Sequence, residues 1–284
     1  MTRHGGPRLP LVLLPLGVDD TQLDATLAAL DAGTPPGSQV WIADDAQAGP
    51  RSLAIVERWL SRTPLQAEYT RRQRPIGEVA HLDDALQACG DRDVAVLAAD
   101  AQVLPGWLQA LEACFRGDAA IASATPWCNA GEVAAWPLLG TVNPLPSNPA
   151  QLAAACAAVA PGYPELPAAV DHAVLLRGRA RQRAGGLDAA SFDSWYAALI
   201  DLSQRLSGLG WRNVLCDAAF VARGSEGGPQ PGDQDALAIR WPGWQARLAQ
   251  FLMHDPVHRQ RQALQQALHA SASPTLQADL FPAR

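Results

Sequence analysis

The sequence has no lysine, so all 22 residues counted as Lys or Arg are arginines. Asp and Glu outnumber them at 28, which gives a net charge of −6 and a pI of about 5.5. A chain with this balance lacks the broad cationic surface that binds phosphate backbones, and this excludes a general nucleic-acid-binding protein.

Cysteine and long apolar runs are also scarce. The five cysteines are odd in number and show no CxxC spacing, which argues against a disulfide framework or a zinc site. The apolar run Leu9–Leu16 is broken by two prolines, is too short to span a bilayer and lacks a small-residue cleavage site. The composition therefore predicts reduced thiols in a cytoplasmic protein, with a peripheral position at the inner face of a membrane left open.

The stretch from Asp93 to Leu108 has the clearest pattern in the chain. Val94–Leu97 is a short apolar run typical of a buried strand, Asp100 follows it, and Pro105 precedes a helical pattern. An acid just past the carboxyl end of a buried strand is where open α/β sheets place ligand chemistry. Such an oxygen ligand suits Mg²⁺ or Mn²⁺ carrying a phosphate. On residue types alone, the simpler interpretation is that Asp100 caps the following helix.

Strand and helix patterns alternate through the first half of the chain. Strands are expected at 9–16, 39–43, 67–70, 94–97 and 119–124, and helices at 21–30, 51–61, 78–89 and 106–115. The second half predicts a loop at 130–149, helices at 151–159, 177–183 and 196–209, β segments at 170–176, 212–216 and 219–223, and a helical region at 234–270. This order predicts a mostly parallel α/β sheet flanked by helices, with a C-terminal helical extension.

Several short motifs follow these elements in a set order. They are Pro15-Leu16-Gly17, Asp44-Asp45-Ala46-Gln47, Arg74-Pro75-Ile76-Gly77, Ala98-Ala99-Asp100, Pro105-Gly106-Trp107-Leu108, Gly185-Gly186-Leu187-Asp188-Ala189, Asp201-Leu202-Ser203-Gln204-Arg205 and Gly210-Trp211-Arg212. In this order the chain resembles the family-two inverting glycosyltransferases with the GT-A fold, from about residue 9 to 223. The resemblance implies a donor-binding half at 1–125, an acceptor half at 126–233 and a helical extension at 234–284.

The resemblance also implies the chemistry of the site. The expected reaction moves a sugar from a nucleotide-diphosphate sugar to a glycan or lipid-linked acceptor, in the synthesis of a bacterial surface polysaccharide. Asp45 would accept from the nucleotide base, and Asp100 would hold Mg²⁺ or Mn²⁺, which neutralises the leaving diphosphate as a Lewis acid. Arg223 replaces a late histidine of the family and can pair with phosphate. The expected donor-binding residues are Pro15, Asp44, Asp45, Arg74, Gly77, Asp100 and Arg223.

Two departures from the family pattern affect catalysis. Ala98 stands where the first acid of the Asp-x-Asp motif is expected, so cation binding is expected to be weak and to depend on the nucleotide. The acidic pair that supplies the family's general base falls at Ala198 and Leu199, which cannot accept a proton. Substitute bases, in order of preference, are Asp201, Asp193, Asp188 and Glu226.

Acceptor binding and two rival functions complete the expectations. Trp127 and Trp195 are candidates to stack on a sugar, and His172 is a third acceptor candidate, although a histidine inside a strand is more often a satisfied core residue. The first rival is a catalytically degenerate GT-A domain that binds nucleotide or glycan, or is the partner of an active enzyme; a homodimer is left open. The second, a nucleotidyltransferase, is disfavoured because no Gly-rich basic phosphate loop follows the first strand. Asp45 and Asp100 are expected at the ends of neighbouring strands, facing one cleft.

Overall fold

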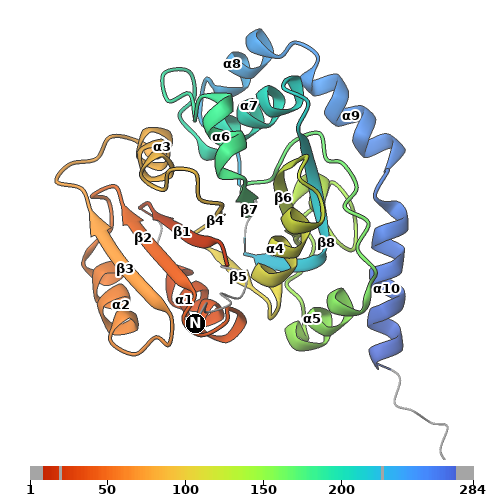
Figure 1. Ribbon diagram of the computed structural model, residues 1–284, viewed down its shortest axis with the longest axis horizontal. Helices are drawn as coiled ribbons and strands as arrows, with labels where there is room; N and C mark the ends of the chain where they lie inside the picture. The colour runs from red at the N-terminus through yellow and green to blue at the C-terminus, as the bar shows by residue number, and fades with distance from the viewer. Residues whose placement is uncertain (1–8, 19–20, 225–226, 273–284) are drawn as a thin grey trace, which may run out of the picture.

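The computed structural model describes residues 9–18, 21–224 and 227–272. Its sheet has eight strands in the order β3-β2-β1-β4-β7-β6-β8-β5 (Figure 1). The strands are β1 Leu11–Leu16, β2 Gln39–Asp44, β3 Gln66–Arg71, β4 Val94–Leu97, β5 Ala101–Val103, β6 Ile121–Trp127, β7 Ala173–Leu176 and β8 Arg212–Arg223. Strands β3, β2, β1 and β4 run parallel, and β7 enters antiparallel between β4 and β6.

Helices cover both faces of this sheet. They are α1 Leu23–Gly33, α2 Pro50–Leu60, α3 Glu78–Ala88, α4 Trp107–Gly117, α5 Pro149–Ala158, α6 Gly178–Ala184, α7 Trp195–Gly208, α8 Asp233–Arg240, α9 Trp244–His254 and α10 His258–Ala272, with a short 3-10 helix η1 at Glu132–Ala134. The predicted GT-A-like α/β fold, mostly parallel and flanked by helices, is therefore confirmed.

Alternation along the central strands separates the two layers of core. Val12 and Leu14 of β1 pack in one apolar cluster with residues of α1, α2 and α4, whereas Leu11 and Leu13 pack in another with residues of α3, α6 and α7. Successive strand residues point to opposite faces, so one apolar strand supplies both cores. This is why β1 and β4 read as continuous apolar runs rather than as alternating ones.

The predicted C-terminal helical region forms three helices. In Figure 1, α9 and α10 run along one side of the molecule, and α10 lies beside α5. Leu264 of α10 and Leu152 of α5 share a third apolar cluster with Phe220 of β8. In the part of the chain that the structure describes, no helix combines the length and apolar character needed to cross a bilayer. The boundaries expected at residues 125 and 233 stay a prediction.

Two strand features differ from the sequence prediction. β5, which is only three residues long, was not predicted; it pairs antiparallel with the end of β8, placing Ala101 opposite Arg223. The two predicted segments 212–216 and 219–223 form one continuous strand, with an irregular register against β6 between Pro126 and Trp127.

All five cysteines are buried and unpaired.

Candidate functional site

A cavity of about 880 Å³ lies at the carboxyl ends of β1 and β4. The chain leaves β1 toward β2 on one side and reaches β4 on the other, so this is a topological switch point, where open α/β sheets bind ligands. The volume falls in the ordinary range for small-molecule sites. Residues that line the cavity include Pro15, Asp45, Gln47, Gly77, Glu78, His81, Asp100, Asp171, Asp193, Trp195, Arg223 and Gln230.

Asp45 forms one wall of the cavity, and backbone groups hold its carboxylate in place. The N–H groups of Ile76 and Gly77 donate to it at 3.0 Å and 2.9 Å. Gly77 has a φ of +97°, a conformation that favours glycine, and it directly precedes α3. The turn before α3 thus fixes Asp45 at the cavity and brings Gly77 there with it, while a donor-binding role for these residues stays a prediction.

Arg223 also lines the cavity, and its side chain lies between two carboxylates. Its Nε donates to Asp100 at 2.9 and 2.8 Å, and its Nη1 donates to Asp171 at 3.0 Å. Burial lowers the pKa of Arg223, but Asp171 and Asp100 outweigh it and raise that pKa above its usual value. Asp45 and Asp100 face one cavity as predicted, but β1 lies between their strands, so the strands are not neighbours.

The start of α7 and the start of α3 meet at the cavity. Trp195 donates its backbone N–H to Glu78 at 3.2 Å, and the exposed Asp193 lies two residues before it. Burial raises the pKa of Glu78, with a smaller opposing effect from that hydrogen bond. Asp233 anchors the segment by accepting from the backbone of Asp193 and Ser194. Two predicted residues, Asp193 and Trp195, are thereby brought to the cavity.

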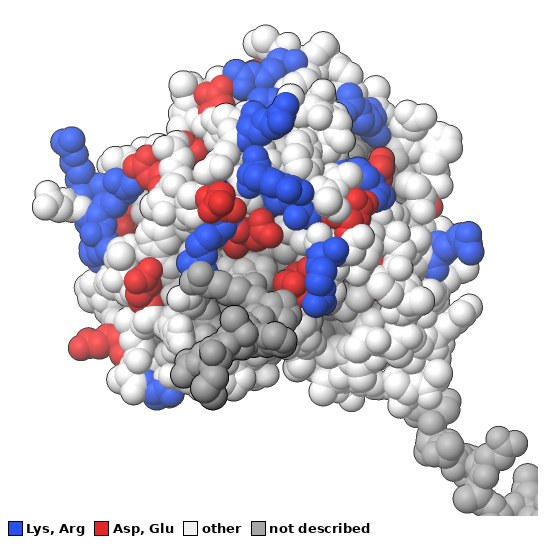
Figure 2. Space-filling view, in the orientation of Figure 1, with Lys and Arg blue, Asp and Glu red and all other residues white. Residues whose placement is uncertain are grey.

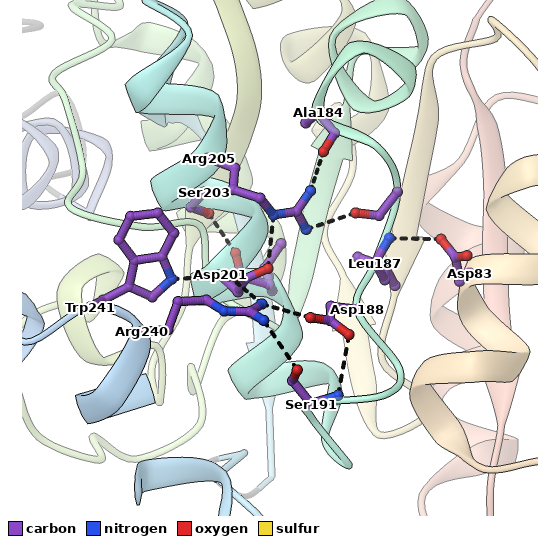
Figure 3. A network of polar contacts seen from close by, with 12 residues as sticks. Asp83, Ala184, Leu187, Asp188, Ser191, Asp201, Ser203, Arg205, Arg240 and Trp241 are labelled. Atoms are coloured by element: carbon purple, nitrogen blue, oxygen red, sulfur yellow. Dashed lines mark hydrogen bonds and ion pairs between the residues drawn. The ribbon is translucent and has the colours of Figure 1, made fainter. Parts of the chain in front are cut away.

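Asp188 and Asp201 lie outside the described lining of the cavity, and both hold arginines (Figure 3). Asp201 is fully buried and accepts from Arg205 at 2.9 Å and from Trp241 at 2.9 Å. Arg240 bridges Asp201 and Asp188 at 3.2 and 2.7 Å. This network joins α7 to α8, so its acids serve the packing of helices. Glu226, the fourth substitute base considered, lies outside the described residues.

Other predicted site residues are also placed away from the cavity. Trp127 is fully buried in the core. His172 is fully buried, its Nε2 lies 3.1 Å from the carbonyl oxygen of Pro126, and burial lowers its pKa to about 3. Asp44 pairs with Tyr69 and Arg71 at the base of the following turn. Arg74 is exposed and is not among the residues that line the described cavity.

Sequence reasoning missed Glu78, His81 and Asp171. Glu78 directly follows the Gly77 motif and begins a helix, which was a usable signal. Asp171 precedes β7, the antiparallel strand, and only the strand order shows that it lies near Asp100. His81 was hidden as one polar residue on the buried face of α3, one turn past the helix start.

The charged groups of the cavity do not fit a divalent cation as they stand. Within the described residues, no group of three or more His, Cys, Asp or Glu side chains is arranged to hold a metal ion. Ala98 lines the cavity where the first acid of the motif was expected, and Asp100 is engaged by Arg223. On the face in Figure 2, acidic and basic side chains are interspersed, so no one-sign patch stands out there.

Comparison with known proteins agrees with this architecture. Residues 20–154 match the family described as Glycosyl transferase family 2. No curated protein sequence matches this chain. The chain therefore contains a glycosyl transferase family 2 domain with the GT-A fold, as predicted.

Solved structures with the same fold share little sequence with this chain. GalNAc-T7 with UDP, GalNAc and Mn²⁺ superposes with a TM-score of 0.62 at 12% identity, over 92% of this chain and 55% of that one. The mannosyltransferase PcManGT from Pyrobaculum calidifontis, with GDP-Man and Mn²⁺, gives 0.54 at 15% identity, over 92% and 74%. S. aureus TarS 1–349 with UDP-GlcNAc gives 0.55 at 13%, over 95% and 76%. The chain thus spans little more than half of the GalNAc-T7 chain, and these matches establish the fold alone.

Proposed function

We propose that the protein is a glycosyltransferase that binds a nucleotide-diphosphate sugar in the cavity at β1 and β4. The observation that carries the proposal is that Asp45 and Asp100, from two separate family motifs, line one cavity at the switch point of the sheet. The family-2 domain over residues 20–154 supports the same reaction class. The printed ligands of the structural relatives, UDP, UDP-GlcNAc and GDP-Man, are the donors to test first.

The proposed roles follow the walls of the cavity. The nucleotide base lies toward Asp45 and Gly77, with Pro15 beneath it, and the diphosphate lies toward Arg223. The sugar and the acceptor lie toward Trp195, whose neighbour Asp193 is the proposed general base. Among Asp193, Asp188 and Asp201, we select Asp193 because it lines the cavity, whereas the other two hold Arg240. Inversion, transfer of a hexose, a bacterial surface polysaccharide as product and a cytoplasmic location belong to the same proposal.

Fewer observations support a divalent cation at Asp100 than support the donor site. The titles of two relatives include Mn²⁺. In this chain, Asp100 would need oxygens from the nucleotide as further ligands, and Arg223 would have to release it. The weak, nucleotide-dependent binding of Mg²⁺ or Mn²⁺ that the family resemblance implies would therefore compete with the ion pair between Arg223 and Asp100.

Nucleotide binding gives the direct test of the donor site. A ligand that binds only the native state raises the melting temperature. We expect UDP or GDP to raise it, and Asp45→Asn to abolish the shift because the base loses its charged acceptor. Asp24→Asn is the control, since Asp24 is an exposed acid that pairs with Arg58, and neither residue is among those that line the described cavity. If neither UDP, GDP nor their sugars shift the wild-type protein, the donor-site proposal is wrong.

A degenerate binding protein is the second candidate, and one observation favours it. Ala198 and Leu199, at the expected base positions, are buried in the apolar core, so α7 offers no carboxylate there. This candidate predicts nucleotide binding without release of nucleotide diphosphate from any donor sugar. Donor hydrolysis or transfer by the wild-type protein would exclude it.

A further inference from the structure

The guanidinium of Arg223 lies between the carboxylates of Asp100 and Asp171. The three side chains are largely shielded, with 12%, 22% and 10% of their surfaces exposed. Asp100 follows β4, Asp171 precedes β7 and Arg223 ends β8, so three different strands converge on one charge cluster. Two shielded carboxylates at such close range require a positive charge between them.

Hydrogen bonds with the Asn129 side chain fix the backbone of Arg223. Asn129 accepts from the N–H of Arg223 at 2.8 Å and donates to its carbonyl oxygen at 2.9 Å. Arg223 also pairs with Ala101 of β5, the residue that follows Asp100. A side chain so anchored is held at its partners at high effective concentration, whereas a free cation must be drawn from solution.

Part of the guanidinium remains available to a ligand. A guanidinium has five N–H donors in a planar fork. The Nε group and one N–H of Nη1 are used by Asp100 and Asp171, and no hydrogen bond to a described residue uses Nη2. Planar N–H pairs of this kind match phosphate oxygens.

We propose that Arg223 is the resident cation of the donor site, taking the place of a divalent metal ion between Asp100 and Asp171 and binding the donor diphosphate directly. The inference rests on the proposed function for its ligand, but the occupation of the acid pair by Arg223 can be tested without any nucleotide. Because a guanidinium keeps its charge at any accessible pH, Arg223 always supplies the positive charge that a metal ion would otherwise supply to the diphosphate. Nucleotide binding by this protein is therefore independent of divalent cations.

The first experiment measures Mn²⁺ binding to the protein without nucleotide, by electron paramagnetic resonance of free Mn²⁺. Wild-type protein leaves Mn²⁺ free. Arg223→His removes the guanidinium from between Asp100 and Asp171 and supplies an imidazole ligand in its place, so it gains a Mn²⁺ site. The opposite results, tight binding by wild type or no gain in folded Arg223→His, overturn the proposal.

Arg212→His is the matched control, because Arg212 begins the same strand and also joins two carboxylates. It contacts Asp118 at 2.6 Å and Glu165 at 2.9 Å, but the Glu165 side chain is 70% exposed. These acids separate into water once the arginine is removed, so no Mn²⁺ site forms there. A gain as large as that of Arg223→His would mean that any freed acid pair binds Mn²⁺, which contradicts the specific role of Arg223.

The second experiment uses unmodified protein and so does not depend on the folding of a variant. The dissociation constant of UDP or GDP is measured by calorimetry in EDTA and in Mn²⁺. The two values agree within about twofold, and Arg223→Ala weakens binding about 10-fold or more in EDTA, the scale of one charge-assisted hydrogen bond. Binding that requires Mn²⁺ refutes the inference while sustaining the proposed function. Binding of neither nucleotide under either condition refutes the proposed function, and the Mn²⁺ titration of Arg223→His still decides the role of Arg223.

Discussion

Leu199, the position where the resemblance implies a general base, is 1% exposed and belongs to the apolar core on which α7 packs. A carboxylate at this position would therefore be a buried charge within the helix packing. Asp193 lies on the approach to the same helix and faces the cavity instead. At the scale of single residues, the proposed base is therefore Asp193, because Leu199 has no group that can accept a proton.

Restoring an acid at the family position is expected to fail. Leu199→Asp buries a charge and removes apolar contacts, so it lowers the free energy of unfolding by about 3 kcal/mol or more. Leu209→Asp is the control, since Leu209 follows the same helix with 49% exposure and its substitution costs about 0.5 kcal/mol or less. Urea denaturation measures both. A stable Leu199→Asp protein with increased turnover would show that the helix can present a base there.

Substitutions of Asp193 and Asp201 are expected to affect different properties, turnover for Asp193 and stability for Asp201. Asp193→Asn lowers turnover by about 100-fold with nearly unchanged nucleotide affinity and melting temperature, because its carboxylate is exposed at the cavity. Asp201→Asn lowers the free energy of unfolding by about 3 kcal/mol, because Arg205 and Arg240 lose a fully buried partner. Transfer assays and denaturation curves distinguish the two. Unchanged transfer by Asp193→Asn would remove it as the base.

At the scale of elements, the parts of the fold that could be predicted were those encoded locally. The strands at 94–97 and 39–43 and the helices after them have apolar patterns that need no distant partner, and these elements appear where expected. β5 could not be predicted, because three residues carry no periodicity and the strand exists only through its pairing with β8. Asp171 could not be predicted as a site residue either, because only the antiparallel insertion of β7 places it beside Arg223.

The turn between β3 and α3 makes a testable demand on one glycine. At Gly77, φ is +97°, and its N–H holds Asp45, so Gly77→Ala strains the backbone by about 1–2 kcal/mol and weakens nucleotide binding. Gly208→Ala is the matched control: Gly208 ends α7 in open space and lacks a positive φ, so alanine there is neutral or stabilising by up to about 1 kcal/mol. Thermal denaturation compares the two. Equal stability of both variants would mean that the turn relaxes without cost.

At the scale of the whole molecule, a buried histidine, His172, lies within the same sheet as the proposed donor cavity. His172 lies in the interior next to Asp171, with Nδ1 unpaired among the described residues. Burial, with a smaller effect from the charge of Arg223, lowers the pKa of His172 from 6.5 to about 3. The folded state therefore holds this ring neutral over a range of pH in which the unfolded chain protonates it.

The stability of the protein is expected to depend on pH through this histidine. Between pH 6.5 and about 3 the unfolded state binds more protons at His172 than the folded state, so its contribution to stability is complete above 6.5 and is lost as the pH falls toward 3. His172→Gln should flatten the decline of the melting temperature with acid over this range. His254→Gln, at an exposed histidine of α9, should leave the profile unchanged. A profile for His172→Gln parallel to that of wild type would contradict the assignment.

The five buried thiols can report local unfolding of the protein. All are unpaired: Cys114, Cys156 and Cys216 lie in α4, α5 and β8, Cys89 directly follows α3, and Cys128 directly follows β6. Burial raises the pKa of Cys128 and of Cys156 to about 12, so their reactive thiolate form is rare as well as inaccessible. A maleimide added to native protein will modify each site at a rate set by the local opening of its own segment. Mass spectrometry of the tagged peptides would then rank the local unfolding of helices and strands without any engineered probe.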